Sequence, residues 1–437
     1  MNKWNNVKIS DFLYKREGVY KPNHQKVKNL KRLQKIDFAG NIHIVDKKSK
    51  TNMIIIKQGD LVISGINVSK GALAVYEGKE DITATIHYSS YTFNKNKISI
   101  DFLKNFLKSS KFIQLLKNQV KGGIKTEIKP KHILPLEIKL PDKLEQEKIV
   151  HILNNLEKNI TELNNEVIGQ QSLIKQLRQA ILQEAVEGKL TVDWRKKHTE
   201  LISGENSAEN LLKKIKIEKE QLIKEKKIKK QKSLLPISEE EKSFKIPEGW
   251  IWIRVGEVIE IIMGQSPPGY SYNKKGVGLP FFQGKKEFGI IYPKGNSVWC
   301  HKPKRISRKN DILISVRAPV GDINLSDKEY SIGRGLSIIR NFSKNLLTWY
   351  TYFFLDAIKN QWDVKGSFFS AITKEIIINR IFPLPSIFEQ QVIVNRISNF
   401  MNIVDELEKQ VIERKEQTTQ LMHSVLREAF EQKQENI

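Results

Sequence analysis

Cysteine is almost absent from this chain, which has one, Cys300, in 437 residues. A lone cysteine excludes an internal disulfide framework and suits a reducing compartment. No apolar run approaches the length of a membrane span, and the first residues, MNKWNNVKIS, lack the apolar core of a signal peptide. We therefore expect a cytoplasmic protein without a membrane partner.

Signatures of catalysis are also lacking. The sequence contains no Walker A motif and no His/Cys spacing typical of a metal site. The stretch SPPG, from Ser266, resembles the polar-Pro-Pro-aromatic motif of amino-methyltransferases, but Gly269 occupies the aromatic position and no cofactor loop precedes it. Cys300-His301 is an isolated pair, and GRG at 333–335 is too short for a dinucleotide loop. The sequence therefore predicts no catalytic residue and no metal site.

Positive charge is abundant. The chain has 74 Lys and Arg against 49 Asp and Glu, a formal charge of +25. Such an excess is typical of proteins that bind nucleic acid. Biased codon usage, which enriches Lys, Ile and Asn together, would also raise the charge. Ten of the lysines lie between Lys213 and Lys232, where a solvated linker helix would place them. From the charge we expect a nucleic acid as the partner.

The chain repeats itself. LPDKLEQEKIVHILNNLEKNITEL begins at Leu140, and LPSIFEQQVIVNRISNFMNIVDEL begins at Leu384. With this offset, residues 120–187 align with 364–431 without a gap, and about one third of the pairs are identical. Weaker similarity lies upstream of the repeats, where GDLVISG resembles NDILISV and NKWNNVKISDFL resembles EGWIWIRVGEVI. The chain therefore contains a duplicated unit.

Each repeat predicts a long helix. The Leu-Pro dipeptide ends the preceding segment, and Glu145 and Glu389 then fall in the first turn, where they suit the helix dipole. Apolar residues follow at heptad spacing, and both copies interrupt the seam at the same place, with Gln170 and Arg414. The first seam position holds Leu153, Ile160, Val167, Ile174 and Ile181, answered by Ile397, Val404, Val411 and Val425. The second holds Ile149, Leu156, Leu163 and Leu177, answered by Ile393, Phe400, Leu407 and Leu421. Two such helices in one chain predict an antiparallel coiled coil.

The remaining residues mix short β-like runs, turns and a helix in two stretches of similar length. We expect an α+β fold with internal pseudo-two-fold duplication. The expected domains are a first mixed domain (1–139), a central coiled-coil helix (140–194), a charged, partly helical and mobile linker (195–245), a second mixed domain (246–383) and a distal coiled-coil helix (384–437).

This arrangement resembles the specificity subunit of type I restriction–modification systems. Besides the two helix starts, the matching stretches are QEAVEGKLTVDWR, IPEGWIWIRVGEV, GQSPPGYSYNKKGVGLPFFQG (264–284), ISVRAPVGDI (314–323) and IGRGLSIIR (332–340). The likeness covers nearly the whole chain and is weaker over 1–139, which fits because recognition domains vary with their target. The resemblance implies that the two mixed domains are target-recognition domains.

The resemblance also implies the working complex. Each domain would read one half of a bipartite, asymmetric DNA site, and the paired helices would dock two modification (methyltransferase) subunits. A restricting complex would also contain two restriction subunits. The chain itself would be no enzyme and would bind no cofactor. The assembled complex would use S-adenosylmethionine for DNA methylation, and ATP and Mg²⁺ for restriction in phage defence.

Candidate DNA contacts follow from residue type. Phosphates attract Lys, Arg and the amides of Gly-rich loops, while base edges attract Arg, Asn, Gln and Ser at loop tips. Lys121 and Lys365, which the repeat aligns beside glycines, are assigned to backbone contacts. The first domain contributes Lys21, Asn23, Ser69 and Lys70, and the second contributes Gln265, Ser266, Tyr270, Tyr272, Gln283, Lys285, Arg317 and Arg334. Arg317 could instead pair with Asp322 inside its domain.

Two rival functions stay open from the residues alone. One is a stand-alone DNA methyltransferase or endonuclease, against which the incomplete motifs argue. The second is a coiled-coil scaffold without a DNA role, which explains the helices but not two Gly-rich, Arg-bearing β domains in a chain of charge +25.

Overall fold

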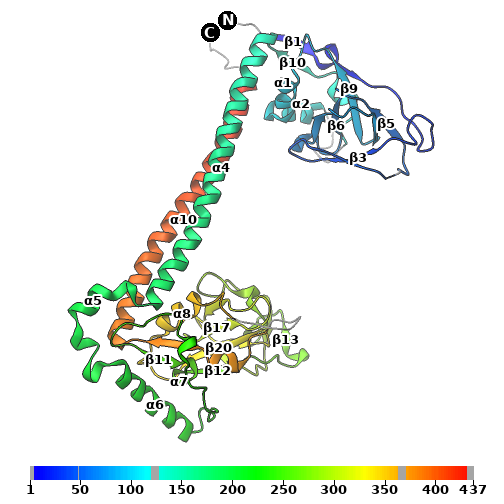
Figure 1. The fold of residues 1–437 in the computed structure, drawn as a ribbon. Coiled ribbons are helices and arrows are strands. Elements are labelled where there is room, and N and C mark those ends of the chain that lie inside the picture. Colours follow the sequence, from blue (N-terminus) through cyan, green and yellow to red (C-terminus); the bar gives the residue numbers. More distant parts are fainter. Residues whose placement is uncertain (1–3, 48, 120–126, 363–370, 431–437) are drawn as a thin grey trace. The chain divides into compact units, whose positions relative to one another are not determined.

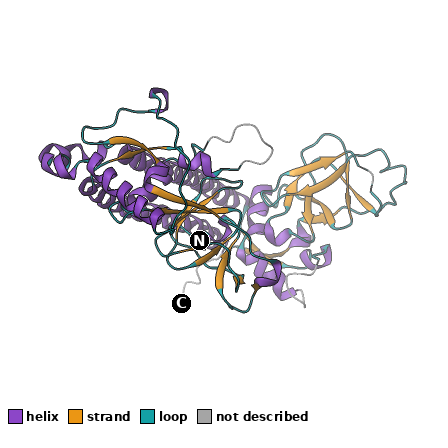
Figure 2. Ribbon diagram, turned by 90° about the horizontal axis from the view of Figure 1, so that it is seen from below, coloured by secondary structure: helices purple, strands orange, loops and turns teal. Residues whose placement is uncertain are grey.

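The computed structural model describes residues 4–47, 49–119, 127–362 and 371–430 (Figure 1). Residues 1–169 and 411–437 form one compact unit, and residues 170–410 form the other. Both units contain helices and strands, as the sequence predicts (Figure 2).

The first unit contains two four-stranded sheets, ordered β2-β9-β6-β7 and β4-β3-β8-β5, and a short pair, β1-β10. The strands are β1 (Asn5–Lys8), β2 (Leu13–Lys15), β3 (Arg32–Ile36), β4 (Ile42–Val45), β5 (Met53–Ile56), β6 (Leu61–Ser64), β7 (Leu73–Val75), β8 (Ile82–Thr85), β9 (Tyr88–Phe93) and β10 (Glu137–Leu140). The short helices are η1 (Ile9–Asp11), η2 (Val68–Lys70), α1 (Ile100–Lys108), α2 (Ser110–Gln119) and α3 (Pro130–Ile133).

The second unit repeats this plan, with sheets ordered β12-β20-β17-β18 and β13-β15-β14-β19-β16 and the pair β11-β21. The strands are β11 (Ile251–Arg254), β12 (Ile259–Met263), β13 (Tyr272–Asn273), β14 (Leu279–Phe282), β15 (Trp299–Cys300), β16 (Ile306–Ser307), β17 (Ile312–Ser315), β18 (Ile323–Leu325), β19 (Tyr330–Ile332), β20 (Leu336–Asn341) and β21 (Ile381–Leu384). The helices are α7 (Val255–Val258), η7 (Gly269–Ser271), η8 (Lys285–Glu287), α8 (Thr348–Ala357) and α9 (Lys374–Ile378).

The weak upstream similarity is confirmed by the central strands. Strand β6 comes from GDLVISG and β17 from NDILISV, and each is fully buried within its sheet. Because side chains alternate along a strand, Leu61 and Ile63 enter the larger core while Val62 enters the core between the sheets. Strand β17 does the same, with Leu313 as the residue that faces the second sheet.

The long helices are α4 (Lys143–Val186) and α10 (Ile387–Phe430). In the first unit Phe430, the last residue of α10, packs on Phe102 and shares a core with Leu153 near the start of α4. In the second unit Leu182, near the end of α4, shares a core with Ile397 near the start of α10. The predicted antiparallel pairing is therefore correct.

The same glutamine attaches each long helix to its domain. Gln146 and Gln390 are both fully buried. Each side-chain oxygen accepts the backbone N–H of the residue before a domain helix, α1 at 2.8 Å and α8 at 3.0 Å. Each side-chain amide donates to the carbonyl of the repeated proline, Pro141 or Pro385. The Glu-Gln pair of each repeat thus locks helix to domain through a buried amide.

The two seam positions differ in burial, which the heptad did not predict. Of the first position, the α4 residues and Ile397, Val404 and Val411 are buried. In the second, Ile149 and Ile393 are buried in the cores of the two units, whereas Leu163, Leu177, Phe400, Leu407 and Leu421 are 37–47% exposed. Two packed helices bury one column of side chains, and the neighbouring column stays exposed wherever no domain core covers it.

The charged linker is packed rather than mobile. After α4 come η3 (Lys189–Thr191), α5 (Val192–Lys197), η4 (Thr199–Leu201), η5 (Gly204–Asn206), α6 (Ala208–Lys224) and η6 (Glu239–Glu241). Leu211 and Ile215 of α6 enter the core of the second unit, and the Lys219 ammonium donates to the Gly256 carbonyl at 2.7 Å. The lysines conceal an apolar face with helical spacing, which is why composition alone suggested a mobile segment.

Arg254 holds the end of this linker, and replacing it should release that segment. Arg254 is 3% exposed, and its guanidinium donates to the carbonyls of Leu235 and Pro236 and to both carboxylate oxygens of Glu241 at 2.6 and 2.7 Å. This hydrogen bonding lowers the pKa of Glu241 to about 2, so the pair is charged at neutral pH. For Arg254→Ala we expect exchange of backbone amides in 230–245 to accelerate at least about tenfold, because charge-assisted bonds of this kind contribute about 2 kcal/mol.

Hydrogen exchange with peptide resolution checks this result. Lys242→Ala is the matched control, since Lys242 pairs with Glu239 at the surface of the same segment. Equal exchange in both variants would contradict the role assigned to Arg254.

Candidate nucleic-acid interface

Three loops of the second domain meet at one end of the sheet β12-β20-β17-β18. They follow β12 (264–268), join β17 to β18 (316–322) and precede β20 (333–335). The antiparallel registers place Met263 opposite Ser337 and Ser315 opposite Leu336, so the three loops leave the sheet at the same edge. We call these loops, with residues 283–285 after β14, the second rim.

Four predicted residues gather on this rim. The Ser266 hydroxyl donates to the Gln283 side-chain oxygen at 3.2 Å, and the Arg334 guanidinium donates to the Ser266 hydroxyl at the same distance. Gln265, Gln283 and Arg334 are exposed. They form a cluster of amide, hydroxyl and guanidinium groups, the groups that hydrogen-bond to base edges.

The other four predicted residues lie around this cluster. The Tyr272 hydroxyl donates to the Pro267 carbonyl at 3.0 Å, which fixes its ring beneath the loop, and burial raises its pKa. Tyr270 is 70% exposed, with the Lys302 ammonium 5.1 Å from its ring centre. Lys285 pairs with Asp322. Arg317 is exposed, and no side-chain partner for it is found among the residues that the structure describes.

Glycines bring the rim loops together. A side chain on Gly264 would meet the Gly333 carbonyl oxygen at 2.1 Å, and one on Gly335 would meet the Gln283 carbonyl oxygen at 2.3 Å. Backbones therefore pass each other where no Cβ fits. The sequence pattern did not show this role, although the glycines stood in the matching stretches quoted above.

The first domain has a corresponding rim. Strands β2, β9, β6 and β7 stand in the same order and direction as β12, β20, β17 and β18. Its loops are 16–31 after β2, 65–72 between β6 and β7, and 86–87 before β9, and we call them the first rim.

The predicted residues of the first domain fall on two of these loops. Lys21 and Asn23 are exposed after β2, and Lys70 lies between β6 and β7 with its ammonium 5.5 Å from the ring centre of Phe38. Ser69 lies in η2, next to Lys70 in the sequence. The contacts of the described residues do not join the two pairs. Lys121 and Lys365 lie outside the described residues.

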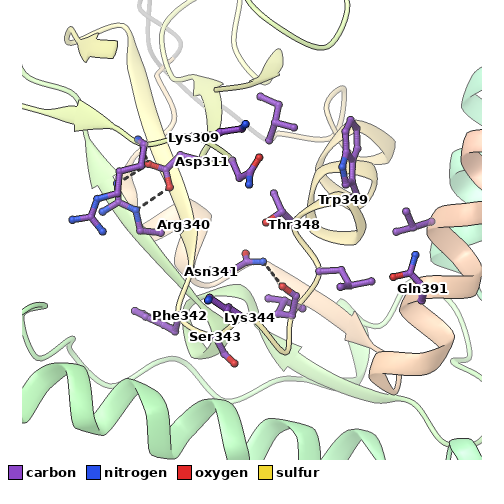
Figure 3. Close-up of a pocket in the computed structure, with 16 residues that line it drawn as sticks. Lys309, Asp311, Arg340, Asn341, Phe342, Ser343, Lys344, Thr348, Trp349 and Gln391 are labelled. Carbon is purple, nitrogen blue, oxygen red and sulfur yellow. Dashed lines mark hydrogen bonds and ion pairs between the residues drawn. The ribbon is translucent and has the colours of Figure 1, made fainter. Parts of the chain in front are cut away.

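A cavity of about 520 Å³ lies at the opposite end of the second domain's sheet (Figure 3). Arg340 and Asp311 face each other there, joined by two hydrogen bonds of 2.8 and 2.6 Å, and Trp349 of α8 and Gln391 of α10 line the far side. Since the guanidinium and the carboxylate satisfy each other, this cavity carries no unpaired charge from the pair. Within the described ranges, no group of three or more His, Cys, Asp or Glu could hold a metal ion.

Comparisons with known proteins agree with the duplicated plan. Residues 247–417 match the family model described as type I restriction modification DNA specificity domain. The putative type I restriction enzyme MjaX specificity subunit of Methanocaldococcus jannaschii is 31% identical over 402 residues, which cover 87% of this chain and 81% of that protein. This chain belongs to the family of type I restriction–modification specificity subunits. It is the DNA-recognition subunit, a non-catalytic member of its complex.

Other relatives and solved structures resemble this specificity subunit. The EcoAI specificity subunit of Escherichia coli is 30% identical over 259 residues, covering 55% of this chain and 42% of that protein. A chain from a structure of complex assembly and conformational transition in the type I system superimposes with a TM-score of 0.71 at 23% identity, covering 98% and 97% of the two chains. The HsdS subunit from Thermoanaerobacter tengcongensis gives 0.57 at 24% identity, covering 98% and 96%. These two structures have the same fold, which confirms the predicted α+β architecture with paired long helices.

No helix of the described residues is both long and apolar enough to cross a membrane.

Proposed function

We propose that this specificity subunit reads an asymmetric, bipartite site on double-stranded DNA, with one domain on each half-site. The observation that carries the proposal is the pair of rims: equivalent edges of two duplicated sheets present different side chains. Equivalent placement gives both domains the same way of approaching DNA, and different side chains give each its own bases. We keep 1–139 and 246–383 as the proposed target-recognition domains, with 140–194 and 384–437 as the helices and 195–245 as the linker.

The contact residues are proposed in two classes. Gln265, Ser266, Gln283, Arg317 and Arg334 are proposed to face base edges, because all lie on the second rim and four of them are exposed. The lysines are proposed to contact phosphates, together with Tyr270 and Tyr272 at the margin. Asn23 and Ser69 are proposed to take the base-reading role on the first rim.

The paired helices are proposed to dock two modification subunits. Exposed apolar side chains recur at the same repeat positions, with Leu144 matching Phe388, Leu163 matching Leu407, Ile168 matching Ile412 and Leu177 matching Leu421. All eight are at least 37% exposed. The same apolar positions are exposed in both copies of the repeat. Two matching apolar surfaces of this kind suit two copies of one partner.

The cofactors are proposed to belong to these partners. S-adenosylmethionine would be used by the modification subunits, and ATP and Mg²⁺ by two restriction subunits in a restricting complex. Because DNA is the proposed ligand, we also propose that the chain works in the cytoplasm.

A map of methylated bases tests this function. Host DNA is sequenced by a long-read method with and without this gene, in the presence of the modification subunit. We expect a two-part motif with a fixed gap to lose its methylation only when this gene is deleted. Exchange of residues 246–383 for the corresponding domain of another specificity subunit should change one half of the motif and leave the other half intact. Methylation that persists without the gene, or a motif with one part, would contradict the proposal.

A further inference from the structure

The two central strand pairs are in the same register. Ser64 at the end of β6 lies opposite Tyr88 at the start of β9. Ser315 at the end of β17 lies opposite Leu336 at the start of β20. Residues of the two sheets can therefore be matched one by one at the edge from which the rim loops emerge.

The match continues for one residue beyond the strands. The backbone N–H of Gly65 donates to the His87 carbonyl at 2.8 Å, and the backbone N–H of Val316 donates to the Gly335 carbonyl at 2.9 Å. The same backbone hydrogen bond is therefore present at both rims. The residues next to it occupy corresponding backbone positions in the two domains.

Those next residues differ in chemistry between the domains. The second rim places Arg317 and Arg334 there, both exposed. The first rim places Ile66 and Ile86 at the corresponding positions, 57% and 51% exposed. An apolar pair in one domain thus replaces a cationic pair in the other, on an otherwise duplicated edge.

These two kinds of side chain recognise different bases. A guanidinium pairs with the O6 and N7 acceptors of guanine, whereas an apolar side chain contacts the C5-methyl group of thymine. We propose that Ile66 and Ile86 contact thymine methyl groups in the major groove of the first half-site, in the places where Arg317 and Arg334 contact guanines of the second. This inference rests on the proposed function of the two rims.

The surroundings of Ile86 are compatible with DNA. The neighbouring His87 ring is held by the Glu127 carboxylate, with 2.9 Å between Nδ1 and Oε1. The Lys129 ammonium lies 3.8 Å from the same carboxylate. The Glu127 carboxylate is thus flanked by a lysine and an imidazole, which reduces its repulsion of phosphates.

Deoxyuridine provides the test, because it lacks only the methyl group of thymine. The complete complex with its modification subunits is titrated with duplexes carrying the site found by methylation mapping, each with one first-half thymine replaced by deoxyuridine. We expect affinity to fall about fourfold for each contacted methyl group. A complex with Ile66→Ala and Ile86→Ala should bind the thymine duplex more weakly and should not distinguish it from the deoxyuridine duplex.

The second half-site supplies the matched measurement. Replacing its guanines with 7-deazaguanine removes the N7 acceptor, and we expect affinity to fall about tenfold at a contacted guanine. Arg317→Ala with Arg334→Ala should abolish that difference and leave the effect of deoxyuridine in the first half-site unchanged. Ile66→Val with Ile86→Val, which keeps apolar contact, should retain sensitivity to deoxyuridine.

Each outcome has a definite meaning. If no deoxyuridine in the first half-site weakens binding by the unaltered complex, the inference is wrong, whether or not the alanine variant folds. If Ile66→Ala with Ile86→Ala prevents assembly with the modification subunits, the two side chains contact protein rather than DNA, and the inference is again wrong. A complex that binds no two-part duplex would instead contradict the proposed function.

Discussion

Replacing Glu389 with alanine should lower the free energy of unfolding of the second unit by about 3–5 kcal/mol, as is typical when one partner of a buried ion pair is removed. The Glu389 side chain has no exposed surface. Its carboxylate accepts hydrogen bonds from the Thr191 hydroxyl at 2.6 Å, from the Trp250 indole N–H at 2.8 Å and from the Arg195 guanidinium. Without the carboxylate, the guanidinium of Arg195, 11% exposed, is left as an uncompensated charge in the interior.

The matched control is Glu145→Ala, since Glu145 occupies the same place in the first repeat. Its carboxylate lies 3.5 Å from the Lys148 ammonium at the surface of α4, and an exposed pair of this kind contributes at most about 1 kcal/mol. Glu389→Gln keeps an acceptor for Trp250 but removes the charge, so we expect an intermediate loss.

Urea unfolding followed by tryptophan fluorescence measures the effect, and hydrogen exchange of the peptides around Thr191 and Trp250 localises it. The two variants Glu389→Ala and Glu145→Ala should differ by several kcal/mol. Equal stabilities would show that the buried cluster does not hold the second unit together.

Glu389 also links three of the separated stretches that carry the family resemblance. Thr191 and Arg195 belong to QEAVEGKLTVDWR, Trp250 belongs to IPEGWIWIRVGEV, and Glu389 belongs to LPSIFEQQVIV. The cluster joins the end of α4, the start of the second domain and the start of α10 through side chains. These residues therefore serve the junction between the helix pair and the second domain.

The sequence predicted the positions of the long helices better than the burial of their side chains. Heptad spacing is a local property, so it located α4 and α10 and their antiparallel pairing. It did not predict that most residues of the second seam position are more exposed than those of the first, because burial depends on what covers the flank of the helix pair. It also could not distinguish Glu145 from Glu389, since the difference lies in the segment after α4 that folds back onto Glu389.

For the rim residues, too, the sequence gives the residue type, whereas the contacts between distant loops depend on the fold. Residue type selected Ser266, Gln283 and Arg334 as candidate DNA contacts, and the structure brings these side chains into contact from loops far apart in the sequence. Their contact with DNA stays a prediction. The alternative pairing of Arg317 with Asp322 is not found, because Asp322 instead pairs with Lys285 from a third loop. Ile66 and Ile86 escaped attention because an isoleucine in a short sequence window resembles a core residue, and only the register of the duplicated sheets shows that both are exposed on a rim.

Replacing Asp60 or Asp311 with alanine should destabilise one domain and spare the other. These aspartates immediately precede the similar central strands β6 and β17, and each accepts two hydrogen bonds from an arginine. The arginine comes from a different strand in each domain: Arg16 follows β2, whereas Arg340 lies on β20. Asp60 is 1% exposed and Asp311 is 3% exposed, so neither arginine would find water to replace its partner fully.

We expect a loss of about 3 kcal/mol in each case, near the lower end for breaking a buried pair, because the arginine side chains are 26% and 20% exposed. Asp60→Ala should also free the Ser90 hydroxyl, which donates to this carboxylate at 2.7 Å. Asp81→Ala is the surface control, since its carboxylate lies 3.8 Å from the Lys57 ammonium and is 39% exposed.

Hydrogen exchange with peptide resolution separates the two domains in one experiment. Asp60→Ala should accelerate exchange in β6 and β9 but not in β17 and β20, and Asp311→Ala should do the reverse. Each domain contains its own sheet, its own core and its own arginine, so the damage has no reason to spread from one to the other. Exchange that accelerates in both domains for either variant would mean that the duplicated domains unfold as one cooperative body, and that a change of DNA target in one domain has a cost in the other.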